Sequence, residues 1–207
     1  MFRSDPLPAD FPQIQTLLSD PERMEPGVTF FNLIRPGNGL LAAVDERVEV
    51  VWYYRQSIPG ILDSRRLKNG HLLFLDQQGA GEVDMLGNTI QRWHPANLDR
   101  SKTDFLALSL DSAHHEIFDM PSGNFLTLSS ESRTLPDYPT SETDPKAPTA
   151  PSHVIGDIVG EFRRDGTIER QWSLFDILDP YRIGFDSLRG NWDDTHRDNI
   201  DAVVWRE

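Results

Sequence analysis

The sequence predicts an all-β protein, a β-propeller built from four-stranded antiparallel blades. Short runs rich in Val, Ile, Leu, Phe, Trp and Tyr follow one another from Val28 onward, and each ends at a Gly, Asn or Asp turn. Tryptophans that close two-strand hairpins recur at blade spacing. Trp52 and Trp93 are 41 residues apart, and Trp93 and Trp172 are 79 apart, about two such units. Each tryptophan is expected to be an apolar plug between adjacent blades.

The first 27 residues are predicted to form an N-terminal arm laid on the β domain. Residues 1–27 contain five prolines, which leave room for little regular structure. Residues 28–207 then form the propeller-like domain, which we expect to hold about four blades at roughly 40 to 45 residues each. The total of 207 residues suffices for one well-buried domain or two small ones.

Two kinds of element repeat along this domain. One is a Gly- and Asn-containing turn that leads into an apolar strand, as at 36–39, 68–70 and 121–124. The other is a hairpin that closes on tryptophan, as at 82–93 and 160–172, with Gly at the turn where a positive φ is required.

Other segments depart from this pattern. Residues 45–52 read as a glycine-free version of the hairpin. Residues 134–152, rich in Pro, Thr and Ser, are expected to form an irregular loop outside the sheet. The pattern of short apolar runs stops at 172–181, where we expect a short helix. Another apolar run follows at 200–205.

Composition and charge exclude several classes of protein. The formal net charge of −13 is the opposite of what a phosphate-backbone binder needs, so no nucleic-acid partner is expected. Because cysteine is absent, a disulfide framework, a thiolate zinc site and a cysteine nucleophile are all excluded. The sequence shows no signal peptide, and no apolar run is long enough for a membrane span.

Histidines are the scarce candidates for chemistry, and three of the six, His71, His94 and His153, are expected to be structural. His114 and His115 lie at the mouth of a strand. Because neighbours on a strand point to opposite faces, only one of the two can face a common pocket. The innermost strand of each propeller blade lines the central channel, so this position favours a ligand site.

His196 also precedes an apolar strand, about 80 residues after His115. Two strand-entry histidines in different blades would converge at one end of a channel. A solvated histidine in a charged loop is the alternative. We expect no metal site, because neither a second histidine at i+2 or i+4 nor a carboxylate cluster in a recognised register accompanies the pair.

Several runs together resemble the PAPS-independent arylsulfate sulfotransferase (arylsulfotransferase) family of bacteria, over roughly residues 28–205. The runs that carry the resemblance are Phe31–Arg35, Val51–Arg55, Leu67–Gly70, Glu82–Asn88, His114–Glu116, Leu128–Glu131 and Trp172–Asp179. The resemblance implies a six-bladed propeller, so about four blades would be an incomplete ring. It also implies transfer of a sulfuryl group from a phenolic sulfate ester to a phenol acceptor through a sulfohistidine, with no cofactor.

The resemblance also implies which residues contact the substrate. The family's paired-histidine segment corresponds to His114 and His115, with His115 preferred because it directly abuts the strand, and its second clamp histidine corresponds to His196. Its asparagine corresponds to Asn199, one residue later than the pattern, because Asp198 occupies the expected place. The family's nucleophilic histidine lies further along, so this chain alone is expected to be a truncated, inactive form.

The expected partners are small-molecule phenols and aryl sulfates, while homo-oligomerisation stays open. The compartment is also open, since the family is mostly periplasmic or secreted and this chain shows no signal. The alternative function is a non-catalytic propeller-like module that binds a ligand or a protein at its funnel. A metal-dependent hydrolase that uses His115 and His196 is a third reading.

Overall fold

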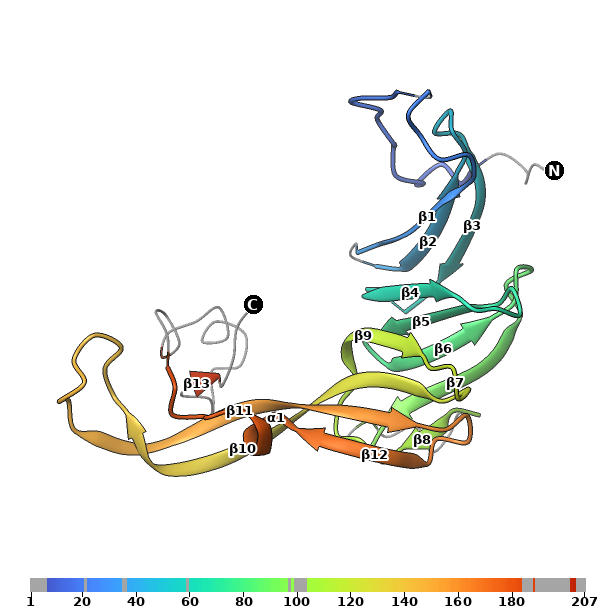
Figure 1. The fold of residues 1–207 in the computed structure, drawn as a ribbon. Helices are drawn as coiled ribbons and strands as arrows, with labels where there is room; N and C mark the ends of the chain where they lie inside the picture. The colour runs from blue at the N-terminus through green and yellow to red at the C-terminus, as the bar shows by residue number, and fades with distance from the viewer. Residues whose placement is uncertain are drawn as a thin grey trace. The chain divides into compact units, whose positions relative to one another are not determined.

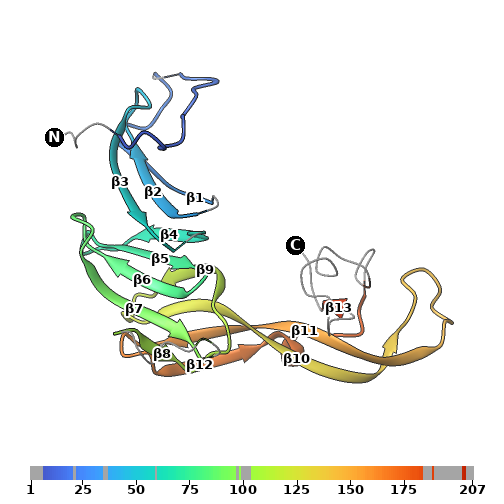
Figure 2. The same ribbon diagram turned by 180° about the vertical axis from the view of Figure 1, so that it is seen from behind.

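The computed structural model describes residues 7–20, 22–34, 37–58, 60–96, 98, 104–183 and 188, and the backbone of 202–203. Throughout these residues the protein is all-β, as predicted. Its regular structure consists of three sheets and one helical turn, α1 (Leu174–Ile177), which falls within the segment expected to be helical. Figures 1 and 2 show the ribbon from two sides.

The chain divides into two compact units, which are described separately. The first consists of Met1–Arg92 and His115–Ile117, and the second of Trp93–His114 and Phe118–Glu207. The first sheet lies in the first unit and has the antiparallel order β1 (Thr29–Leu33), β2 (Gly39–Val44), β3 (Val50–Gln56). The central strand β2 is buried along its whole length.

The second sheet has the order β4-β5-β6-β7-β8. Its strands are β4 (Asp63–Arg66), β5 (Leu72–Asp76), β6 (Gly79–Val83), β7 (Thr89–Pro95) and β8 (Leu106–Leu108). The strands β4, β5 and β6 pair antiparallel, whereas β8 runs parallel to the end of β7. Strands β5 and β6 are buried along their whole length.

Within the first unit, one apolar cluster joins the first sheet to strands β5 and β6 of the second sheet. It contains Leu41, Ile61, Leu72, Phe74 and Val83, with Phe30, Trp52 and Tyr54 packed against it. The described part of the N-terminal arm contains neither helix nor strand. It is held to β3 by an edge-to-face contact between Phe11 and Tyr53 and by a two-bond ion pair between Asp10 and Arg55.

The third sheet lies mostly in the second unit and has the order β12-β11-β10-β9, with β13 beside β11. Its strands are β9 (His114–Asp119), β10 (Phe125–Pro139), β11 (Thr149–Phe162), β12 (Ile168–Ser173) and β13 (Ala202–Val203). Strands β10 and β11 form a long antiparallel hairpin, drawn from yellow to orange in Figure 1. The distal part of this hairpin has its own core, in which Tyr138, Val154 and Phe175 are buried.

This hairpin corrects two expectations. The segment 134–152 is not an irregular loop, because β10 continues to Pro139 and β11 starts at Thr149, which leaves only 140–148 between them. The 79 residues from Trp93 to Trp172 also do not form two sheets of their own. Strands β9 to β12 belong to one sheet, and the long strands β10 and β11 account for many of the residues in excess of one 41-residue repeat.

Five tight turns with the same hydrogen bonds account for the repeat seen in the sequence. In each, the first residue's N–H donates to the carbonyl of the fifth residue, and the fourth residue's N–H donates to the carbonyl of the first. Their fourth residues are Gly70, Gly87, Gly123, Gly166 and Val48. The four glycines have φ between 84° and 87° and Val48 has φ 62°, so the glycine-free turn adopts the same shape.

The tryptophans differ in burial more than the repeat suggested. Trp93 is fully buried, stacks edge-to-face on Phe125 and Phe162, and donates its indole N–H to the carbonyl of Arg164 at 2.9 Å. Trp172 is 39% exposed. Both stand five residues after the last residue of their turn, a position that Tyr54 occupies in the first sheet. Trp52 therefore lies two residues before the position equivalent to Trp93. The 41-residue spacing between Trp52 and Trp93 does not join equivalent positions of the repeat.

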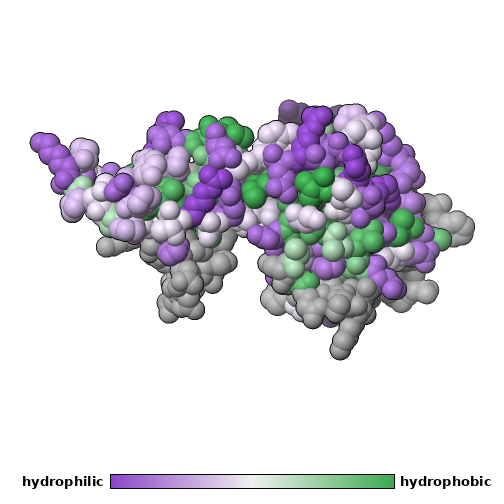
Figure 3. Space-filling view, turned by 90° about the horizontal axis from the view of Figure 1, so that it is seen from below, coloured by the Kyte–Doolittle hydropathy of each residue, from purple (hydrophilic) through white to green (hydrophobic). Residues whose placement is uncertain are grey.

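Hydrophilic side chains cover most of the face shown in Figure 3, and hydrophobic residues form separate, smaller areas among them. No helix among the described residues is long and apolar enough to span a membrane.

Candidate active site

Three serines of the second unit hold the segment that leads into β9. The Ser112 hydroxyl lies 2.9 Å from the Ser130 hydroxyl and accepts the Ser130 backbone N–H at 3.0 Å. The Ser112 backbone N–H donates to the Ser129 hydroxyl at 3.1 Å. These hydrogen bonds hold Ser112, two residues before His114, against β10.

His114 reaches from β9 towards a carboxylate on β11. Its Nε2 lies 3.7 Å from Oδ1 of Asp157, and Asp157 stands directly opposite Ser130 in the β10–β11 pairing. Because the sheet order is β11-β10-β9, the two side chains meet over the strand that carries Ser130. The His114 side chain is 23% exposed and that of Asp157 is 7% exposed, so this pair lies at the edge of the solvent.

Asp157 is an unusual residue for a strand interior. Burial raises the pKa of its carboxyl group from 3.8 to about 6. Its Oδ2 is buried and has no hydrogen-bond partner among the described residues. A carboxyl group in this setting costs folding free energy when it is ionised, and groups of this kind concentrate at functional sites.

His115 belongs to the first unit and has a different setting. Its side chain is exposed, and its backbone has φ 60°, a left-handed conformation that is rare outside glycine. Two residues later, Ile117 is fixed to β4. Its N–H donates to Oδ2 of Asp63 at 3.0 Å and its carbonyl accepts from Nε of Arg65 at 2.6 Å. These bonds anchor the strand beside the left-handed residue.

The structure describes only part of the predicted site. His114 and His115 both lie in β9, as the strand-mouth interpretation requires. His196 and Asn199 lie outside the described residues, so whether they meet the pair stays a prediction. Asp157 was missed by sequence reasoning, although one signal was available, because it is the only charged residue in the apolar run Val154–Val159.

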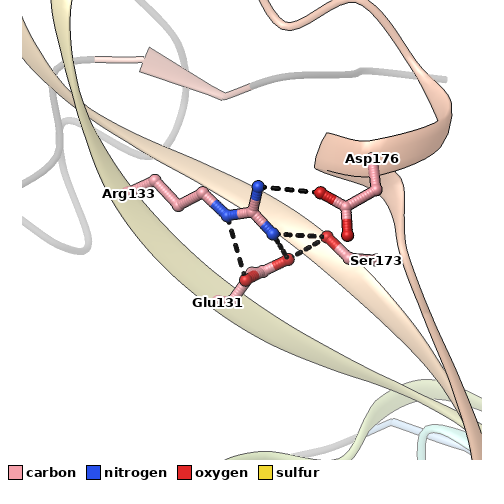
Figure 4. Close-up of polar contacts among 4 residues, drawn as sticks. All are labelled: Glu131, Arg133, Ser173 and Asp176. Atoms are coloured by element: carbon pink, nitrogen blue, oxygen red, sulfur yellow. Dashed lines mark hydrogen bonds and ion pairs between the residues drawn. The ribbon is translucent and has the colours of Figure 1, made fainter.

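A second polar cluster lies near this site on the same sheet, and Figure 4 shows its members. Arg133 donates to both carboxylate oxygens of Glu131, to Oδ1 of Asp176 and to the hydroxyl of Ser173. Ser173 also donates to Glu131. These partners raise the pKa of Arg133, mainly through the hydrogen bond to Asp176, and its guanidinium stacks 4.7 Å from the Phe175 ring.

This cluster faces away from Asp157. Glu131 pairs with Gly156, and a side chain at Gly156 would collide with Phe175, so Phe175 covers the Gly156 side of β11. Asp157 is the next residue and therefore points to the opposite face. The Arg133 cluster thus fastens α1 to the sheet and is separate from the His114 site. Within the described residues, no three His, Asp or Glu side chains come together as metal ligands would.

The second unit therefore presents a histidine beside a buried carboxylate, at the mouth of a strand in an all-β protein. The chain matches the family Arylsulfotransferase (ASST) over residues 14–203, and it belongs to that family. This match confirms the resemblance found in the sequence and extends it into the N-terminal arm. No curated protein with which the sequence was compared matches it.

Proposed function

We propose that the chain carries the sulfate-clamping part of an aryl-sulfate sulfotransferase site. The reaction moves a sulfuryl group from a phenolic sulfate ester to a phenol acceptor. Membership of the arylsulfotransferase family over residues 14–203 is the observation that carries this proposal. The moving group bears charge on its oxygens, so hydrogen-bonding and cationic groups must surround it while a nucleophile attacks in line.

In this proposal His115 and His196 clamp the sulfate, and His114 and Asn199 bind the substrate. The sulfuryl group passes through a sulfohistidine whose nucleophilic imidazole is supplied by another histidine of the family's site. The left-handed backbone at His115 supports a functional role, because strained residues concentrate at active sites. Small-molecule phenols and aryl sulfates are the proposed partners, and no cofactor takes part.

We further propose that the three sheets are successive blades of a β-propeller. The repeated turn geometry supports this assignment, since turns with the same hydrogen bonds recur in all three sheets. Each sheet is antiparallel along most of its strands, as blades are. The strand mouth at His114 and His115 would then open towards the funnel of the ring.

Binding of an aryl sulfate tests the function directly. The chain is titrated with p-nitrophenyl sulfate and observed by heteronuclear NMR, with p-nitrophenol as the ligand that lacks the sulfate. We expect saturable shifts with the ester alone and no release of p-nitrophenol by this chain. Equal binding of both ligands would instead favour a general aromatic-binding module, and steady release would place a nucleophile within these residues.

Single substitutions locate the clamp. His115→Ala and His196→Ala are each expected to weaken binding about tenfold or more, because each removes a charge-assisted hydrogen bond to the sulfate. His153→Ala is the matched control, since His153 is exposed and contacts the Thr134 hydroxyl on the long hairpin. Unchanged affinity in both clamp variants would contradict their assignment.

A further inference from the structure

Asp157 is a buried carboxyl group to which the reaction proposed above assigns no role. Only 5% of the residue is exposed, and Oδ2 has no hydrogen-bond partner among the described residues. Elsewhere in the protein, buried carboxylates have such partners: Asp76 accepts from Gln56 and Arg92, and Glu161 accepts from Asn124. A buried carboxyl group with one oxygen unsatisfied destabilises a fold, so its presence points to a function.

His114 is the titratable group that faces Asp157. Their closest atoms, Nε2 and Oδ1, are 3.7 Å apart, which is ion-pair distance but too long for a direct hydrogen bond. A bridging water or a small side-chain rotation closes such a gap, and catalytic contacts are commonly longer before the substrate binds. Directly opposite Asp157 on β10 is Ser130, and the nearest residue of β12 on the same face is Trp172, which pairs with Val159. Among the described residues, neither β10 nor β12 therefore brings a charge to this point.

We propose that Asp157 is a positioning residue of the sulfuryl-transfer site, which holds a proton on Nε2 of His114 and so fixes the tautomer of its imidazole. This inference rests on the proposed function. Carboxylates orient histidines in this way at many catalytic and metal sites. The Ser112, Ser129 and Ser130 bonds support the assignment, because they fix the backbone from which His114 projects.

The fixed tautomer gives His114 a defined task in the second half-reaction. With the proton on Nε2, the lone pair is on Nδ1, which accepts the proton of the acceptor phenol. The phenol O–H electron pair forms the new S–O bond while the S–N bond of the sulfohistidine breaks and returns its pair to nitrogen. His114 becomes an imidazolium, whose charge the Asp157 carboxylate stabilises. Because burial raises the pKa of Asp157 to about 6, this support is lost as the carboxyl group is protonated below that pH.

Imidazole NMR of the whole chain tests this pair without relying on turnover. Long-range ¹H–¹⁵N spectra distinguish the two neutral tautomers, and the His114 signals are identified by their loss in His114→Gln. We expect the Nε2–H tautomer to dominate in the wild type near pH 7.5, a mixture of tautomers in Asp157→Asn, and partial recovery in Asp157→Glu. Asp176→Asn is the matched control, since that carboxylate pairs with Arg133 on the other face.

A second measurement, made on Asp157 instead of His114, tests whether the effect of Asp157→Asn comes from the pair rather than from a general change in structure. The Asp157 carboxyl ¹³C signal is followed against pH in the wild type and in His114→Gln, and we expect its titration to change when the imidazole is removed. An unchanged His114 tautomer in Asp157→Asn, or an unchanged Asp157 titration in His114→Gln, would overturn the proposal. Failure of the wild type to bind p-nitrophenyl sulfate would instead contradict the proposed function, even if the tautomer depends on Asp157.

Discussion

Val48 has a backbone conformation that its side chain disfavours. It is β-branched, yet it has φ 62° at a turn position where four equivalent residues are glycine. A β-branched residue in the left-handed region is a genuine outlier, because its Cβ crowds the following carbonyl. Asp45 holds the turn by accepting the backbone N–H groups of Arg47 and Glu49 at 3.0 Å each, so the strain is tolerated.

Val48→Gly is therefore expected to stabilise the protein. Removing the left-handed strain gains about 1–2 kcal/mol, and the added freedom of glycine in the unfolded chain takes back about 0.5–1 kcal/mol. The free energy of unfolding, measured in urea, should rise by about 0.5–1 kcal/mol. Gly123→Val is the reverse control, since its φ is 87° and a Cβ there has open space, and it should be destabilising. A loss of stability in Val48→Gly would mean that its packing outweighs the strain.

The Asp157 carboxyl group predicts a pH dependence of stability. Burial raises its pKa to about 6 in the folded protein, from 3.8. Between these values this group binds more protons in the folded than in the unfolded state, so its contribution to stability falls as the pH rises from about 4 to 6. Asp157→Asn removes this slope and should raise the free energy of unfolding at pH 7 by on the order of 2 kcal/mol. Urea unfolding at pH 4, 5, 6 and 7 measures it, and a parallel pH profile in the two proteins would contradict it.

At the level of elements, the hairpin tryptophans are expected to contribute unequally. Trp93 is buried against Phe125 and Phe162, and its indole N–H donates to the Arg164 carbonyl. Trp93→Phe should cost about 2–4 kcal/mol of unfolding free energy, because it leaves a cavity and removes the hydrogen bond from the indole N–H. Trp172→Phe, at the equivalent but 39% exposed position, should cost less than about 1 kcal/mol. Equal losses in thermal and urea unfolding would refute this ranking.

The long hairpin contains prolines in a segment whose composition is typical of a loop. The β10–β11 register shifts between Leu135 and Tyr138, so Pro136 lies in the irregular stretch, with Pro151 opposite it. Proline lacks the N–H that a sheet ladder requires and is tolerated at such bulges. Local sequence indicates where proline interrupts a ladder. It does not indicate that two strands resume their pairing beyond it.

At the scale of the whole molecule, the sequence predicts local structure well but does not predict which distant strands pair. The β class, the turns and the short helix follow from apolar runs, Gly–Asn turns and the break after Trp172, and the residues that carried the family resemblance were sufficient to identify the family. The His114–Asp157 pair was not predictable, because it depends on β9 and β11 flanking β10 across 43 residues of sequence. The left-handed backbone at His115 also has no signature in the sequence.

The net charge of −13 predicts that salt stabilises the folded protein. Carboxylates outnumber cationic groups, so folding brings like charges together, and raising the ionic strength from about 0.01 to 0.15 M shortens the Debye length from about 30 to 8 Å. The free energy of unfolding should therefore rise with NaCl over this range.

Sodium sulfate at the same ionic strength separates general screening from the proposed clamp. A bound anion adds stability through its preference for the folded state, and sulfate is also excluded from protein surfaces in general. We expect sulfate to stabilise the wild type more than NaCl does, and this excess to shrink in His115→Ala while the NaCl effect stays the same. An excess of equal size in both proteins would assign it to surface exclusion, and a fall in stability with NaCl would contradict charge repulsion as the dominant long-range effect.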